Sequence, residues 1–224
     1  FVHYSEFRYN SQYGIRASGV GTYLWVNNCD IHHNQQGIKV YASRDGALFS
    51  YNTIRDNSPG DNDYAGLMAG SGTFSHNTIK NNTLTSDESE SAAGVRVDGG
   101  YLDHNIITGN SYTGNGSHTA SGVFIYNGGG GFSHNIIFDN TGGDYTVFQR
   151  RNNQNLFTHN IIADGQTRFE EIDLRGPITN NVFAGGLTGR LEYEEDDADF
   201  SKNVILNSPG GNYLEWLEIY GSSY

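Results

Sequence analysis

The chain has 224 residues, of which 36% are hydrophobic and 30 are glycine, so a single globular core would be thin. The formal net charge of −12 argues against nucleic acid as a partner, because that binding depends on a dense cationic surface. No apolar run is long enough to span a membrane, so we expect no membrane insertion.

One short motif recurs along the whole chain. Residues 74–79 read Phe-Ser-His-Asn-Thr-Ile, and residues 132–137 read Phe-Ser-His-Asn-Ile-Ile. About nine copies occur, spaced roughly 21 to 30 residues apart. Self-similarity at this period indicates a solenoid, in which each repeat buries its apolar face only against its neighbours. The copies begin at Val2, Val26, Phe49, Phe74, Leu102, Phe132, Phe157, Ile178 and Phe200.

An asparagine occupies the fourth place of most copies, where a strand is expected to bend. Asparagine tolerates the backbone angles of a tight bend, and its amide can hydrogen-bond to the coils above and below. Cys29 occupies the same place in the second copy, which favours a buried thiol over a nucleophile. We therefore predict an internal, structural asparagine stack. Its members are Asn52, Asn77, Asn105, Asn135, Asn160, Asn181 and Asn203.

A second column follows each copy and reads Gly-Ile-x-Val or a close variant. Its alternation of apolar and variable residues predicts a half-buried strand. Each coil is therefore expected to contain three short strands: Gly-Ile-x-Val, then Phe-Ser-x up to the asparagine bend, then Thr-Ile-x-x-Asn. The clear members of the second column are 14–17, 37–40, 66–69, 94–97 and 122–125, and the less regular ones are 172–174 and 191–193.

With these coils and this asparagine stack, the chain resembles the right-handed parallel β-helix proteins of the pectate-lyase-like superfamily. The resemblance covers nearly all of the sequence and implies an all-β fold of about nine coils. We expect one domain over residues 1–224 that is part of a longer β-helix chain. The superfamily includes lyases, hydrolases, epimerases, tailspikes and adhesins, so the resemblance does not select one reaction. It implies an extracellular or cell-surface location.

In that superfamily, polysaccharides bind over the sheet that corresponds to the Gly-Ile-x-Val strands. Three long connections, at 57–66, 82–94 and 110–122, would form one wall of a groove there. Guanidinium groups bind sugar carboxylates or sulfates, and aromatic rings stack on pyranose faces. The alternative is a solvated strand face of ordinary mixed charge. The substrate-binding candidates at the outward positions are Arg16, Lys39, Phe124 and Tyr126. Arg150 and Arg151, in the corresponding turn of a coil whose register the sequence does not fix, are candidates as well.

Four charged residues on the same strip are the catalytic candidates, as acid, base or charge-stabilising groups. They are Arg96, Asp98, Asp173 and Arg175. Arg175-Gly176-Pro177 resembles the start of the Arg-x-Pro-x-x-Arg motif of pectate lyases, although Asn180 stands where the second arginine belongs. The leading hypothesis is binding and cleavage, by a lyase or hydrolase, of an acidic extracellular polysaccharide.

An acidic run near the carboxyl end suggests a cofactor. Glu194, Glu195, Asp196 and Asp197 are consecutive carboxylates, and Ca²⁺ prefers clustered carboxylate oxygens. The alternative for this run is a solvated loop. Ca²⁺ is the one cofactor expected.

A column of histidines precedes the asparagine column. His76, His104, His134 and His159 share their place with other residue types, among them Tyr51 and Lys202. The place therefore selects no ligand chemistry, and we expect stacked rings that meet solvent rather than a metal site.

The competing function is a non-catalytic rod, such as an adhesin, a tailspike-like shaft or a self-assembling surface protein. The first coil carries Val2, Tyr4 and Phe7, and the last carries Trp216 and Leu217, with no evident polar cap. Open parallel edges pair readily with other strands, and unlike ends that meet head to tail form filaments. End-to-end self-association is therefore also expected.

Overall fold

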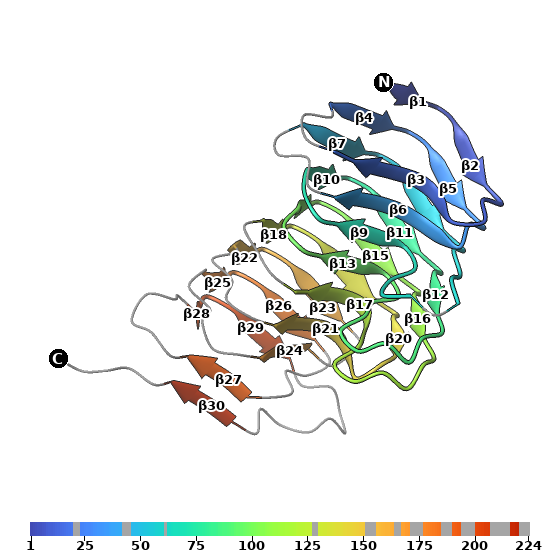
Figure 1. Cartoon of the computed structure of the whole chain (residues 1–224). Helices are drawn as coiled ribbons and strands as arrows, with labels where there is room; N and C mark the ends of the chain where they lie inside the picture. Colours follow the sequence, from blue (N-terminus) through green and yellow to red (C-terminus); the bar gives the residue numbers. More distant parts are fainter. Residues whose placement is uncertain are drawn as a thin grey trace.

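The computed structural model describes residues 1–19, 23–41, 46–60, 62–126, 130–150, 156–163, 167–170, 177–184, 190–193, 200–206 and 216–219. All regular elements within these ranges are β-strands (Figure 1). None of these residues belongs to a helix with the length and hydropathy needed to cross a bilayer. The strands pair in parallel between successive coils, which confirms the predicted all-β parallel solenoid.

Three long parallel sheets form the solenoid, and each coil contributes one short strand to each sheet in turn. The first sheet contains the Phe-Ser-x segments. Its strands are β1 (Val2–His3), β4 (Leu24–Asn27), β7 (Ala47–Ser50), β10 (Thr73–Ser75), β14 (Tyr101–Asp103), β18 (Gly131–Ser133), β22 (Leu156–Thr158), β25 (Ile178–Thr179) and β28 (Phe200–Ser201).

The second sheet contains the segments that follow the asparagine bend. Its strands are β2 (Glu6–Arg8), β5 (Asp30–His32), β8 (Thr53–Arg55), β11 (Thr78–Lys80), β15 (Ile106–Thr108), β19 (Ile136–Phe138), β23 (Ile161–Ala163), β26 (Val182–Ala184) and β29 (Val204–Leu206).

The third sheet contains the Gly-Ile-x-Val segments. Its strands are β3 (Tyr13–Ser18), β6 (Gln36–Tyr41), β9 (Leu67–Ala69), β13 (Val95–Val97), β17 (Ala120–Ile125), β21 (Tyr145–Arg150) and β24 (Thr167–Glu170). The first two sheets each have nine strands and the third has seven, so the predicted count of about nine coils differs from the structure only in detail.

Two smaller sheets complete the described structure. β12 (Thr83–Leu84), β16 (Ser111–Tyr112) and β20 (Thr141–Gly142) extend three middle coils beside the third sheet, and β27 (Arg190–Tyr193) pairs with β30 (Trp216–Ile219). The long connections stack on each other in register: the Thr85 and Thr113 hydroxyls lie 2.8 Å apart, and the Asn115 amide donates to Asp87 at 3.2 Å.

The core is a set of identical or similar apolar side chains stacked from coil to coil. Phe49 and Phe74 stack with ring centroids 5.0 Å apart, and Ile54 and Ile79 are fully buried in paired positions of the second sheet. Burying such a side chain contributes about 1.5–3 kcal/mol. Each coil supplies only a few of these residues, which is why a low hydrophobic fraction is sufficient.

The predicted asparagine stack is present and fully hydrogen-bonded. Nδ2 of Asn77 donates to Oδ1 of Asn105 at 3.0 Å and to the Phe49 carbonyl at 3.0 Å. The backbone N–H of Asn77 also donates to Oδ1 of Asn105, at 2.9 Å. The same pattern runs from Asn52 to Asn203. Each amide therefore satisfies backbone groups that would otherwise be buried without partners.

A second asparagine stack, which the sequence interpretation did not identify, runs along the bend between the second and third sheets. Nδ2 of Asn82 donates to Oδ1 of Asn110 at 2.9 Å and to the Ile54 carbonyl at 3.1 Å. Its members are Asn10, Asn34, Asn57, Asn82, Asn110 and Asn140.

The left-handed backbone angle at each bend belongs to the residue before the asparagine, which corrects the expectation that the asparagine itself adopts it. His76 has φ of 56° and His104 has φ of 54°, and Asn77 and Asn105 follow them. At the second bend, Asp56 has φ of 51° before Asn57. The asparagines are selected for their ladder hydrogen bonds, while the preceding residue accepts the backbone strain.

Candidate functional site

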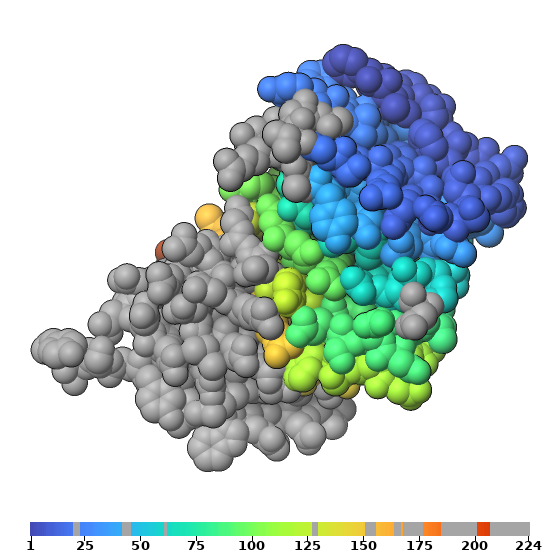
Figure 2. Space-filling model, in the orientation of Figure 1, coloured from blue at the N-terminus to red at the C-terminus, as the bar shows by residue number. Residues whose placement is uncertain are grey.

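The outer face of the third sheet carries a straight column of side chains, one from each strand. Arg16 pairs with Lys39, Lys39 with Met68, and Met68 with Arg96. The column continues through Phe124 to Phe148. Flanking residues such as Val95 and Val97 lie in the core, so the predicted alternation of inward and outward positions is correct here. Figure 2 shows the coils that carry this column as successive bands from blue to green.

At the amino-terminal end of the column, Lys39 lies among tyrosine rings. Its Nζ is 4.8 Å from the ring centroid of Tyr41, 5.4 Å from that of Tyr13 and 5.8 Å from that of Tyr64. The Arg16 guanidinium lies 5.4 Å from the Tyr13 centroid. Each of these contacts is within the range of a cation–π interaction. We call Tyr13, Arg16, Lys39, Tyr41 and Tyr64 the tyrosine–lysine cluster.

Among the residues that the structure describes, no acid neutralises the cations of this cluster. Within the described residues, no carboxylate lies within ion-pair distance of Lys39 or Arg16. Tyr41 and Arg16 are exposed, and Lys39 and Tyr13 are partly exposed. The cluster therefore presents positive charge and aromatic faces to solvent on a chain whose net charge is −12.

Tyr64 forms the buried floor of the cluster. It is 1% exposed, and its hydroxyl has no hydrogen-bond partner among the described residues. Burial raises the pKa of Tyr64 well above its ordinary value, with smaller effects from Tyr13 and Tyr41, so its phenol is neutral at physiological pH. A buried hydroxyl without a partner costs free energy, and such groups need an explanation when they occur.

Farther along the column, Arg96 is held by acidic partners. Its Nε lies 3.1 Å from Asp98, its Nη1 lies 3.4 Å from Asp63, and Nη1 also donates to the Glu90 carbonyl at 3.1 Å. Its side chain is 12% exposed. Arg96 projects from the outer face as expected, and there it is paired with acids and largely covered.

The other predicted residues of this half are also engaged. Arg150 forms an ion pair with Glu90, and Tyr126 packs with its ring 5.1 Å from the Arg96 guanidinium. Phe124 is fully buried against Ala92, Ala120 and Phe148. The expectation that Phe124 offers an open ring to a sugar is therefore wrong, because long connections of neighbouring coils cover it.

Several predicted site residues lie outside the described residues. These are the substrate-binding candidate Arg151, the catalytic candidates Asp173 and Arg175, and the Ca²⁺ candidates Glu194, Glu195, Asp196 and Asp197. The structure brings Arg96 together with Asp98, and Arg16 together with Lys39.

The histidines of the first bend stack on each other, as predicted. Ring centroids are 5.0 Å apart for His76 and His104, 4.6 Å for His104 and His134, and 4.9 Å for His134 and His159. The rings lie on the exposed side of the bend. We call these four residues the histidine ladder.

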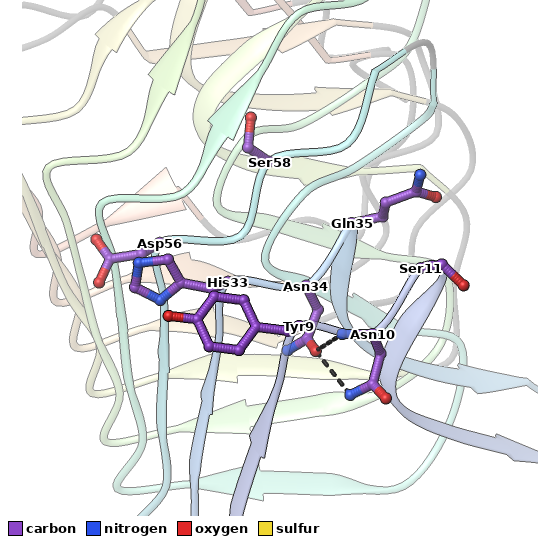
Figure 3. A pocket seen from close by; sticks show the side chains of 8 residues that line it. All are labelled: Tyr9, Asn10, Ser11, His33, Asn34, Gln35, Asp56 and Ser58. Atoms are coloured by element: carbon purple, nitrogen blue, oxygen red, sulfur yellow. Dashed lines mark hydrogen bonds between the residues drawn. The ribbon is translucent and has the colours of Figure 1, made fainter.

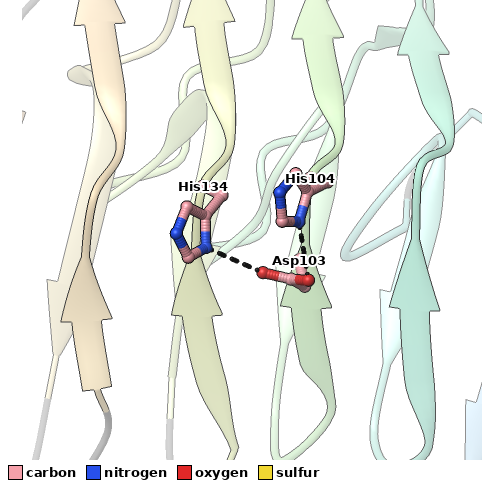
Figure 4. A group of neighbouring side chains, drawn as sticks. All are labelled: Asp103, His104 and His134. Carbon is pink, nitrogen blue, oxygen red and sulfur yellow. Dashed lines mark hydrogen bonds and ion pairs between the residues drawn. The ribbon is translucent and has the colours of Figure 1, made fainter.

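One carboxylate stands beside this ladder (Figure 4). Asp103 Oδ2 lies 2.7 Å from Nδ1 of His104, and Oδ1 lies 3.1 Å from Nδ1 of His134. The Ser133 hydroxyl donates to Oδ1 at 2.7 Å. Partial burial would by itself raise the pKa of Asp103, but the hydrogen bonds from Ser133, His104 and His134 outweigh it and keep the pKa below its ordinary value.

A hollow of about 420 Å³ lies along the second bend of the first coils (Figure 3). It is lined by Tyr9, Asn10, Ser11, His33, Asn34, Gln35, Asp56 and Ser58. The Asn34 Oδ1 accepts hydrogen bonds from the Asn10 backbone N–H at 3.0 Å and from its Nδ2 at 2.8 Å. Its asparagines thus serve the second asparagine stack, which accounts for them without a ligand.

Sequence reasoning missed the tyrosines of the cluster and the carboxylate beside the histidine ladder. Tyr41 carried a usable signal, since it lies two positions after Lys39 and therefore on the same face. Asp103 also carried one, because most other copies have serine or threonine there, as in Ser75 and Thr158. Tyr64 lies in a long connection, where no periodicity indicates which face a residue meets.

Comparison with known proteins gives one match. Residues 1–114 match a family model described as right handed beta helix region, which is half of the chain. A search of curated proteins found no match. A search of solved structures found none either. The matched segment contains the first coils, the amino-terminal part of each asparagine stack and the tyrosine–lysine cluster. The chain therefore belongs to the right-handed β-helix family.

Proposed function

We propose that this protein binds an acidic extracellular polysaccharide, and that the tyrosine–lysine cluster is the contact surface. The β-helix fold supports a carbohydrate-binding or structural role. The observation that carries the proposal is the position of Lys39, which lies among tyrosine rings with no carboxylate in ion-pair distance among the described residues.

The chemistry of the cluster matches a sugar that bears a carboxylate or sulfate. Lys39 and Arg16 supply charge-assisted hydrogen bonds, and the exposed ring of Tyr41 can lie against a pyranose face. Two other cations of the same face are already paired with acids, Arg96 with Asp98 and Arg150 with Glu90. An anionic chain would therefore be attracted to the amino-terminal coils of this sheet.

Cleavage of the polysaccharide stays a prediction from the sequence. Two of its four candidate groups, Arg96 and Asp98, form an ion pair with each other, so Asp98 is not free to act as a base, and Asp173 and Arg175 lie outside the described residues. The proposal is therefore limited to binding. It includes an extracellular or cell-surface location, because acidic polysaccharides are found there. A non-catalytic rod that carries this binding surface is compatible with it.

The test is a calorimetric titration with uronate-containing, sulfated and neutral oligosaccharides, on the parent, Lys39→Ala and Lys80→Ala. Lys80 is on the second sheet and serves as the control for loss of one positive charge. Losing a charge-assisted hydrogen bond should weaken binding of an anionic glycan about tenfold in Lys39→Ala, with little change in Lys80→Ala. Absence of anionic-glycan binding by the parent, or equal losses in both variants, would refute the proposal. Absorbance of unsaturated product in the same samples reports any lyase activity.

A further inference from the structure

The bend between β14 and β15 differs in its chemistry from every other described bend that follows a strand of the first sheet. The residue before the left-handed position is Asp103 in this coil. In the other described coils it is a histidine, asparagine, serine or threonine. These residues are His3, Asn27, Ser50, Ser75, Ser133, Thr158, Thr179 and Ser201. Among the described coils, only this one therefore places a carboxylate beside the histidine ladder at this position.

Two imidazoles face that carboxylate from adjacent coils. Nδ1 of His104 and Nδ1 of His134 each lie against a different oxygen of Asp103, at 2.7 and 3.1 Å. One ligand atom from each residue lies within 4.8 Å of the others. The side chains are 38–49% exposed, so an ion can reach them from solvent. Figure 4 shows that both rings turn this nitrogen toward the carboxylate.

Backbone hydrogen bonds to the next coil hold each of the two histidines in place. The His104 N–H donates to the Ser133 carbonyl at 3.1 Å, and the His134 N–H donates to the Thr158 carbonyl at 3.1 Å. The Ser133 hydroxyl holds the Asp103 carboxylate in place. Such second-layer hydrogen bonds orient ligands and raise the affinity of a metal site.

We infer that Asp103, His104 and His134 form a binding site for a divalent transition-metal ion of the Zn²⁺ class. Two imidazole nitrogens and one carboxylate suit Zn²⁺, Co²⁺ or Ni²⁺, whereas Ca²⁺ prefers six or more oxygen ligands. Each histidine would bind the ion through the lone pair of Nδ1. In that tautomer the ring proton is on Nε2, and Nδ1 no longer donates to Asp103. Three protein ligands leave a fourth position for water or an anion.

The other two residues of the histidine ladder provide control positions for a test of this site. His76 and His159 stack on the pair from either side, at 5.0 and 4.9 Å, but the residues before them are Ser75 and Thr158. Asparagine is the matched replacement for a ladder histidine, because Asn28 and Asn180 adopt the same left-handed angle at this place. Serine is the matched replacement for Asp103, since Ser75 and Ser133 pair with it.

The experiment is a titration of the untagged chain with Zn²⁺ at pH 7.5, followed by calorimetry, with Ca²⁺ titrated in parallel. Asp103→Ser and His134→Asn should each weaken Zn²⁺ binding by about tenfold or more, because losing a ligand costs at least as much as losing a supporting residue. His76→Asn and His159→Asn should change the affinity by no more than about twofold. Cobalt absorption of the Co²⁺-loaded chain, compared between the parent and His134→Asn, gives a second measurement specific to the ligand set.

Three results would overturn the inference. The first is a parent chain with no saturable Zn²⁺ binding. The second is an Asp103→Ser variant, folded by circular dichroism, that binds Zn²⁺ as the parent does. The third is an equal loss in His76→Asn and His134→Asn, which would show that exposed histidines bind the ion without a defined site.

Discussion

Nδ2 of Asn105 donates a hydrogen bond to Oδ1 of Asn135 at 3.0 Å, and Asn105 in turn accepts from Asn77 through its own Oδ1. Each ladder asparagine thus connects three coils through one buried side chain. The relationship repeats at two bends per coil, and it ties the backbone of each coil to the next without any contribution from apolar packing.

Replacing Asn105 by alanine should lower the free energy of unfolding by about 1–3 kcal/mol, because the buried partners of its amide lose their hydrogen bonds. The Phe74 carbonyl is one of these partners, at 2.9 Å. Chemical denaturation of the purified chain measures the change. Asn115→Ala is the control, since Asn115 is exposed in a connection. Equal stability of both variants would contradict the structural role of the stack.

The second asparagine stack should matter as much as the first. Asn82→Ala removes the donor to Asn110 and to the Ile54 carbonyl, so we expect a loss of about 1–3 kcal/mol here too. Thermal melts of Asn82→Ala beside Asn105→Ala compare the two stacks directly. A melting temperature for Asn82→Ala equal to that of the parent would limit the structural role to the first bend.

Gly66 should not tolerate a side chain, although its backbone angle is ordinary. A Cβ there would lie 2.4 Å from the Gly94 carbonyl oxygen and 3.0 Å from Ile79 Cγ2. The clash involves backbone of the next coil, so Gly66→Ala should destabilise the chain by about 1–3 kcal/mol. Gly60→Ala is the matched control, because nothing lies within 4 Å of its Cβ position. Similar melting temperatures for the two variants would rule out the close approach of coils at Gly66.

Arg96→Ala should lower stability, contrary to what an outward position alone predicts. The substitution leaves Asp98 and Asp63 without their cation, and hydrogen bonds to charged groups contribute about 1.5–3 kcal/mol each. Arg8→Ala provides the comparison, since the Arg8 side chain is 53% exposed and lies 3.6 Å from Glu6. Urea denaturation of the two variants should show a lower free energy of unfolding only for Arg96→Ala. An Arg96→Ala variant as stable as the parent would contradict this structural role and would favour a role in ligand binding.

Tyr64→Phe should leave the melting temperature unchanged or raise it, because the hydroxyl it removes is buried without a partner among the described residues. If the hydroxyl is retained for ligand binding, the same variant should bind the acidic glycan less tightly. A melting temperature lowered by several degrees would show that the hydroxyl has a structural partner after all.

The fold could be predicted because a motif that recurs along the whole chain indicates a solenoid. The apolar ladders, the first asparagine stack and the stacked histidines all follow from residues that recur at one place in successive coils, such as His76 and His104. The second asparagine stack was missed because an asparagine that ends a strand, as Asn82 does, is also an ordinary turn residue.

The candidate site was less predictable, because alternation tells which face a side chain meets but not what covers that face. Phe124 and Lys39 occupy equivalent outward places, yet the long connections bury Phe124 and leave Lys39 partly exposed. Charge pairing is equally non-local, since Arg150 meets Glu90 from a coil that lies 60 residues away in the sequence.

The most direct test of the central proposal is a crystal structure of the chain with the acidic oligosaccharide that binds most tightly in the titrations. The sugar should lie over the amino-terminal coils of the third sheet, with its acidic group within hydrogen-bond distance of Lys39 and a pyranose ring against Tyr41. A sugar bound over the histidine ladder, or in the hollow beside Tyr9, would contradict the assignment of the tyrosine–lysine cluster.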